Sequence, residues 1–159
     1  MLTENDFKRS SVLRKLYESM KQSGVPGRIL EKGEEDSPFE MLVCSHEGIP
    51  EHILTGQYFF PEMGAAENVC YFTAIVSILE EIPKEKEDKI RKRVEEANPG
   101  LLCGGLYVYP EAGLVFKLTV PISEGLSEND LFSTIDITAA HALAGAFAFA
   151  SEIFAGSGE

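Results

Sequence analysis

The sequence has few basic side chains for its length. It carries 14 lysine and arginine residues against 26 aspartate and glutamate residues, a formal net charge of -12 over 159 residues. A surface of this charge repels phosphate backbones and anionic lipid headgroups. The composition therefore argues against nucleic acid and against a membrane surface as partners.

Cysteine is also scarce. Cys44, Cys70 and Cys103 are an odd number of thiols, and each lies within or beside an apolar run. This pattern is typical of reduced, packed thiols rather than of a disulfide framework, and it favours the cytoplasm. Residues 1–15 lack the apolar core of a secretory signal, which agrees with a cytoplasmic location.

Long apolar runs are missing as well. The richest stretch, residues 137–150, contains His141 and is 14 residues long, whereas a membrane-spanning helix needs about 20. We expect a buried helix here. With 44% hydrophobic residues the chain can bury a core of its own, so we expect one domain over residues 1–159.

Two alternating apolar runs within residues 101–121 predict a β-hairpin. Leu106 and Val108 share one face, and apolar residues recur at every second position from 114 to 120. Between the runs, Pro110 favours the φ of a type I turn, and Gly113 can adopt the positive φ that follows it. The turn should fix the register of the two strands.

Three helices are predicted from their caps and stops. Thr3 caps the first, which should end near Gly24. Pro83 begins the second, which should stop at residues 98–100, and Ser127 caps the third.

Further strands are predicted between the first two helices. Their candidate segments are residues 28–33, 39–47, 52–62 and 68–82, with a flexible connection at 63–66. Strands that follow one another without long crossovers pair antiparallel. We therefore expect an α+β fold of order α-β-β-β-α-β-β-α, with an antiparallel sheet of about five strands and its helices packed mainly on one face.

The third helix is rich in alanine and glycine from residue 138 onward. Small residues on every face allow close approach to a sheet or to another helix, so we expect burial along more than one side. We expect a homodimer that uses this helix or the open sheet. The candidate contact residues on the helix are Ala142, Gly145, Ala146 and Phe149.

No catalytic motif stands out. Cys44 and His46 lie two apart on a predicted strand and would share a face, as two metal ligands or a nucleophilic pair could. Two ligands do not make a site, and no orienting group or oxyanion glycine pattern accompanies them. We expect no cofactor and no metal. A small enzyme or ligand-binding protein with a site near Cys44, His46 and His52 is the alternative.

Two further features have structural explanations. His141, within an alanine-rich helix, is more typical of a core or interface histidine with one hydrogen bond than of a catalyst. Gly104 and Gly105 precede a strand rather than a helix, so they indicate a bulge or a close backbone contact, not a phosphate-binding loop.

Four aromatic residues on the predicted strands are candidates for a protein-binding surface. They are Tyr58, Phe59, Tyr107 and Tyr109. Cross-strand packing on the second face of the sheet explains them equally well. With the acidic surface and the missing catalytic parts, they favour a protein-binding module whose partner lies against a sheet edge or an apolar groove.

Residues 98–154 carry a family resemblance. Its parts are Asn98, the strand start at residues 105–108, the turn at 110–113, the strand at 114–118, and Pro121, Gly125 and Leu126 ahead of the last helix. This arrangement resembles the C-terminal half of the YbjN-like family, whose fold is that of type III secretion chaperones. The resemblance implies a non-enzymatic, chaperone-like or regulatory binding domain that is acidic, cytoplasmic and often dimeric.

Overall fold

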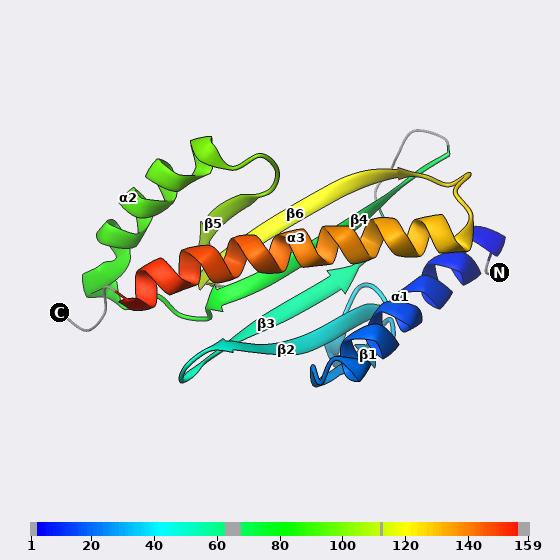
Figure 1. Cartoon of the computed structure of the whole chain (residues 1–159), viewed down its shortest axis with the longest axis horizontal. Helices are drawn as coiled ribbons and strands as arrows, with labels where there is room; N and C mark the ends of the chain where they lie inside the picture. The colour runs from blue at the N-terminus through cyan, green and yellow to red at the C-terminus, as the bar shows by residue number, and fades with distance from the viewer. Residues whose placement is uncertain (1–2, 63–67, 112, 156–159) are drawn as a thin grey trace.

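The computed structural model describes residues 3–62, 68–111 and 113–155 (Figure 1). Its helices are α1 (Glu4–Gln22), α2 (Glu87–Ala97) and α3 (Glu128–Ala155), with short 3-10 helices η1 (Glu34–Asp36), η2 (Lys84–Lys86) and η3 (Asn98–Gly100). Its strands are β1 (Gly27–Leu30), β2 (Met41–Ile49), β3 (His52–Phe59), β4 (Val69–Leu79), β5 (Gly105–Tyr109) and β6 (Gly113–Ser123). The predicted connection at 63–66 lies outside the described residues.

The strands form one antiparallel sheet in the order β1-β2-β3-β4-β6-β5. The predicted α+β class is confirmed, but the described sheet has six strands rather than about five. The candidate segment at 28–33 supplies the additional one, because Gly27–Leu30 pairs along β2 as the short edge strand β1. The 11-residue strand β4 lies in the middle, as its long apolar run predicted.

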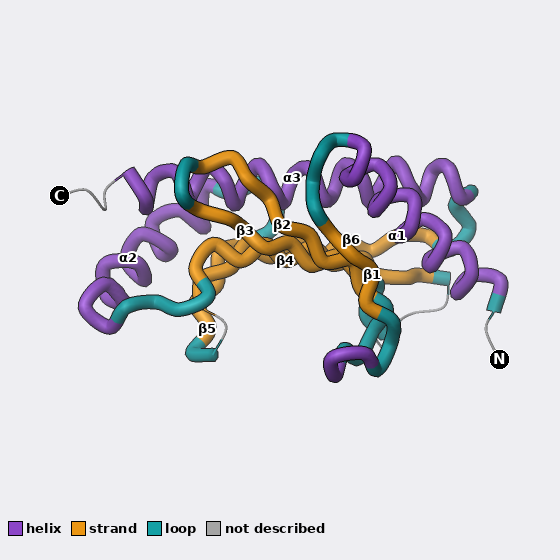
Figure 2. Tube along the Cα trace, turned by 90° about the horizontal axis from the view of Figure 1, so that it is seen from below, coloured by secondary structure: helices purple, strands orange, loops and turns teal. Residues whose placement is uncertain are grey.

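Helices α1 and α3 cover one face of the sheet, as predicted (Figures 1 and 2). Their apolar side chains pack with the sheet in one large core that includes Leu16 of α1, Phe72 of β4 and Ile135 of α3. Helix α2 lies at one end of the sheet, near β5 and the C-terminal end of α3 (Figure 1). There Arg93 and Glu152 form an ion pair of 3.1 Å.

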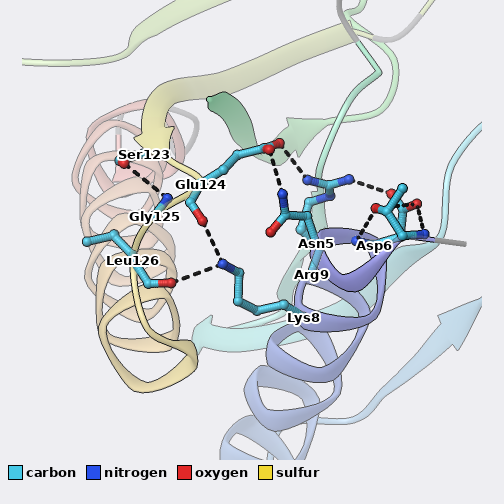
Figure 3. A network of polar contacts seen from close by, with 9 residues as sticks. Asn5, Asp6, Lys8, Arg9, Ser123, Glu124, Gly125 and Leu126 are labelled. Atoms are coloured by element: carbon cyan, nitrogen blue, oxygen red, sulfur yellow. Dashed lines mark hydrogen bonds and ion pairs between the residues drawn. The ribbon is translucent and has the colours of Figure 1, made fainter. Parts of the chain in front are cut away.

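A network of polar contacts fastens the first turns of α1 to the connection between β6 and α3 (Figure 3). The Glu124 carboxylate accepts hydrogen bonds from Asn5 Nδ2 (2.8 Å) and Arg9 Nη1 (2.9 Å). Lys8 Nζ donates to the carbonyl oxygens of Glu124 and Leu126, at 2.7 and 3.0 Å. The predicted Thr3 cap forms at the start of the same helix. These contacts position α1 against α3.

The predicted hairpin is confirmed. Strands β5 and β6 pair with Leu106 opposite Phe116, and Val108 opposite Leu114. Gly113 adopts a φ of +71°, the left-handed conformation expected after the turn. Within the turn, Ala112 lies outside the described residues.

The alanine-rich face of α3 lies against the chain's own sheet. Ala142 and Ala146 are fully buried and Phe149 is 5% exposed, so these three side chains are not available to a second chain. Gly145 faces the ring of Phe116, where a Cβ atom would lie 2.7 Å from Cε2. Close packing explains the small residues of this face, although the surface they pack on belongs to the same domain. The expected burial along more than one side is wrong, because Ala140, Ala144 and Ala148 on the other side of α3 are exposed.

In the described part of the chain, α3 is the one helix that is long and apolar enough to cross a membrane, judged by length and composition. Helix α3 has 28 residues. It is twice as long as the apolar stretch at 137–150, whose 14 residues are too few to span a membrane. In this fold α3 lies along the sheet and beside α1 (Figure 1).

Candidate functional site

Cys44 and His46 share one face of β2, as their spacing predicted, but that face is buried. Cys44 is 1% exposed and His46 is 4% exposed. The Sγ atom of Cys44 lies 3.3 Å from the Sδ atom of Met20 on α1. Burial raises the pKa of Cys44 to about 12. At neutral pH the thiol is therefore protonated, the form least suited to attack a substrate or bind a metal.

His46 forms a buried hydrogen bond with Tyr58 of β3. Its Nε2 lies 2.8 Å from the tyrosine hydroxyl, and the two rings meet edge to face. Gly56 leaves the room for this pair, since a Cβ atom there would lie 2.8 Å from His46 Nε2. Burial lowers the pKa of His46 to about 4 and raises that of Tyr58, so both groups are neutral at pH 7. The pair is a satisfied polar contact inside the core.

His52, the third residue of the alternative site, lies at the start of β3. Its ring stacks on Phe154 of α3, with centroids 3.6 Å apart and planes 4° from parallel. Cys44, His46 and His52 thus contact three different partners and are not gathered around one site. In residues 3–62, 68–111 and 113–155, no group of three or more His, Cys, Asp or Glu side chains is placed to hold a metal ion.

Tyr58 and Phe59 do not form an exposed surface, contrary to the prediction. Tyr58 is fully buried under the helices, and Phe59 on the opposite face is only 9% exposed. Successive strand residues point to opposite faces, so the two rings could not share a surface. Phe39 stacks on Phe59, with centroids 5.3 Å apart. Packing on the second sheet face, the alternative interpretation, describes Phe59 correctly.

Tyr107 and Tyr109 are exposed, as predicted. They lie two apart on β5 and so point to the same face. Leu106, the residue of β5 before Tyr107, points to the other face, into the core, and is 2% exposed. The tyrosines are 46% and 39% exposed, and their rings stack with centroids 6.1 Å apart. They point to the side of the sheet that α1 and α3 leave uncovered.

This uncovered side, called the open face below, is largely uncharged. Pairing across β2, β3, β4 and β6 places most of its central residues in adjoining rows. They are Val43, Ser45, Thr55, Gln57, Thr73, Ile75, Ser77, Val115, Lys117 and Thr119. In Figure 2, β5 at one end and the segment after β1 at the other extend beyond the middle strands, away from α3. The open face is therefore flanked at both ends by the chain.

A hollow of about 330 Å³ lies on the open face beside the tyrosines. Its lining residues are Gln57, Ile75, Ser77, Glu80, Tyr109, Glu111 and Val115. The floor consists of short apolar and uncharged polar side chains, and the two carboxylates are the charged members of the lining. This arrangement suits an uncharged or cationic group that also packs on a tyrosine ring.

A larger hollow, of about 630 Å³, lies between the first half of α1 and the start of β4. Its charged lining residues pair with one another: Arg9 with Asp6 and Glu124, Arg14 with Glu31 and Glu40, and Lys32 with Glu62. The lining carries three cations against five carboxylates, and all eight charged side chains are already engaged with one another in ion pairs, so a charged ligand would have to compete with these pairs. The open face is the better candidate site.

The free edge of β5 is partly closed by a side chain. Asn98 Oδ1 accepts a hydrogen bond from the Leu106 amide (2.8 Å), and Asn98 Nδ2 donates to the Leu106 carbonyl (3.0 Å). Asn98 thus replaces a neighbouring strand at Leu106, and Pro110 has no amide hydrogen to offer. Strand edges blocked in this way resist the addition of another strand. A partner would therefore lie on the open face rather than along this edge.

Replacing Asn98 with alanine should cost about 1–2 kcal/mol of unfolding free energy, because both backbone groups of Leu106 lose their partner. It should also open the β5 edge to self-association. Urea denaturation and light scattering measure the two effects. Asn98→Asp keeps the acceptor for the Leu106 amide but sets a carboxylate oxygen against the Leu106 carbonyl, so it should also be less stable than wild type. Equal stability of all three proteins would contradict this role.

One pair of reactive side chains was not predicted. Cys103, just before β5, and His141 of α3 are both exposed, and Sγ and Nε2 lie 3.1 Å apart. They are 38 residues apart in sequence. Cys44 and Cys70 are buried, as expected of packed thiols, but for Cys103 that prediction is wrong. The single hydrogen bond expected for His141 is present, but His141 is exposed and is therefore not a core histidine. No sequence spacing could have identified Cys103 as its partner.

Comparison of the chain with family models, with curated proteins and with solved structures gives no match.

Proposed function

We propose that this chain is a non-enzymatic protein-binding domain, chaperone-like or regulatory, which holds a polypeptide segment against the open face. The observation that carries the proposal is the exposed Tyr107–Tyr109 stack beside a hollow on a largely uncharged sheet face. Exposed tyrosines bury large areas on binding and lose little conformational entropy, and they are common anchors of protein interfaces.

The charge of the chain indicates the kind of segment. Glu80 and Glu111 line the hollow beside Tyr109, and the chain as a whole carries -12. A lysine or arginine of the partner would find a carboxylate and a tyrosine ring in the same place. Ser77 and Gln57 offer hydrogen bonds to its backbone or polar side chains. We therefore propose a segment that is basic and rich in uncharged residues.

The resemblance to the YbjN-like family supports this proposal, and membership of that family is part of it. The order of helices and strands fits the topology on which the resemblance rests. We further propose that the protein acts in the cytoplasm, where its three free cysteines would stay reduced. Self-association stays a prediction, but its surface must differ from the buried residues Ala142, Ala146 and Phe149.

Replacing both Tyr107 and Tyr109 with alanine should weaken binding of such a segment at least tenfold, because each ring supplies anchor area. The ligand is a decapeptide selected on the wild-type chain from a random library, and affinity is measured by fluorescence anisotropy. Phe7→Ala is the matched control, since Phe7 is an aromatic residue 61% exposed on α1. It should bind the peptide as wild type does.

Peptides selected on the wild type that bind the Tyr107→Ala, Tyr109→Ala variant equally well would contradict the proposal. So would selected peptides that carry a net negative charge. Both tyrosines are exposed, so thermal melting of the double variant should match wild type within about 1 kcal/mol of stability. This control separates a loss of binding from a loss of folding.

A further inference from the structure

The exposed pair Cys103 and His141 is held in place from both sides. His141 lies on α3, which packs along the sheet. Cys103 is followed by Gly104, whose φ is +76° and where a Cβ atom would lie 2.8 Å from the ring of Phe116. Leu106, two residues after Gly104, is held by Asn98, whose side chain binds both of its backbone groups. The two side chains therefore face each other on a fixed framework.

Thiolate sulfur and imidazole nitrogen are the two ligand types that Zn²⁺ prefers in structural sites. Around a tetrahedral zinc ion, a sulfur and a nitrogen ligand lie about 3.6 Å apart. Sγ and Nε2 are 3.1 Å apart, so the exposed side chains need to separate by about half an ångström. The pair can therefore occupy two corners of one coordination sphere.

The described chain does not complete that sphere. In residues 3–62, 68–111 and 113–155, no third His, Cys, Asp or Glu joins the pair to form a metal-binding group. A closed zinc site needs four ligands. A second copy of the chain, related by a two-fold axis, would bring another cysteine and another histidine.

The surroundings of the pair suit a second copy. Leu102, next to Cys103, is 98% exposed, and Ile137, one helical turn before His141, is 69% exposed. Exposed positions 140 and 144 of α3 are alanines, so two α3 helices can approach closely. Two chains of charge -12 repel each other, so a shared cation would oppose that repulsion.

We propose that Cys103 and His141 form half of a zinc site, which the same two residues of a second copy complete as Cys₂His₂. Binding of Zn²⁺ releases one proton from each thiol, and both imidazoles bind in their neutral form. The result is a metal-dependent dimer that buries Leu102 and Ile137. This dimer leaves Tyr107 and Tyr109 free, so it is independent of peptide binding on the open face.

The test is a ZnCl₂ titration of the full chain, with its thiols kept reduced by a phosphine, followed by sedimentation velocity. The mass should double and saturate at one Zn²⁺ per two chains, and a chelator should reverse the change. With CoCl₂ in place of zinc, the absorption spectrum should show the visible bands of tetrahedral cobalt and a thiolate charge-transfer band.

Cys103→Ser and His141→Ala should each raise the zinc concentration for half-maximal dimerisation at least tenfold. His52→Ala is the control, because His52 stacks on Phe154 and should not affect dimerisation. Both altered ligands are exposed, and melting curves check that the variants fold. Binding of one Zn²⁺ per chain without a change in mass would overturn the proposal. A zinc-dependent dimer that persists in Cys103→Ser would do so as well.

Discussion

Replacing Gly145 with valine is expected to lower the free energy of unfolding by about 3 kcal/mol. A Cβ atom at position 145 would lie 2.7 and 2.8 Å from Cε2 and Cζ of Phe116, closer than unbonded carbon atoms approach. The ring is also confined at its other edge, because the backbone of Gly104 is so close that a Cβ atom added there would lie within 2.9 Å of Cε1 and Cζ. Urea denaturation followed by circular dichroism measures the loss.

Ala144→Val is the matched control for this substitution. Ala144 is the preceding residue of α3 and is exposed, so valine there should cost only its lower helix propensity, below about 1 kcal/mol. Equal losses in the two variants would mean that α3 does not pack on Phe116 through Gly145. If the wild type is a monomer and Gly145→Val still loses more stability than Ala144→Val, the contact between Gly145 and Phe116 lies within one chain.

Stability is expected to fall by about 3 kcal/mol as the pH is lowered from 6.5 to 4. Burial lowers the pKa of His46 to about 4 from its ordinary 6.5. In this window the unfolded chain takes up a proton that the folded chain does not, so acid favours unfolding. The stability from the neutral His46–Tyr58 pair is present above pH 6.5 and lost on the way down. Urea denaturation at half-unit pH steps measures the slope.

His46→Gln isolates this contribution. Glutamine can still form a hydrogen bond with the Tyr58 hydroxyl but does not titrate, so the variant should lose most of the slope between pH 6.5 and 4. The pKa of Asp6 is lowered, chiefly by its hydrogen bond with the Thr3 backbone. Its contribution to stability is therefore lost only as the pH falls below about 3.8, its ordinary pKa, which is outside this window. The same slope in wild type and variant would show that His46 is not buried as a neutral group.

The features that local residue patterns encode were predicted from the sequence. The Thr3 cap and the positive φ of Gly113 depend on residues a few positions away, and both are present. Periodicity correctly placed Leu106 and Phe116 on the buried face of the hairpin. The α+β class follows from these elements in order, since consecutive strands without long connections pair antiparallel.

The features that depend on distant contacts were not predicted. Alternation places Tyr58 and Phe59 on opposite faces, but the sequence alone did not reveal that each face is covered at that point, one by the helices and the other by Phe39. Gly145 predicted close packing without naming the surface that it meets, which is the ring of Phe116. Cys103 and His141 meet only because the turn before β5 lies beside α3.

Binding of a polypeptide on the open face is tested most directly by NMR. Backbone amide shifts of the ¹⁵N-labelled chain are recorded as a selected decapeptide is added. Resonances of Tyr107, Tyr109, Ile75 and Val115 should move most, and those of the exposed face of α3 should stay unchanged. Shifts concentrated on α1 and the hollow at Arg9, with β5 unaffected, would contradict the assignment of the open face as the binding site.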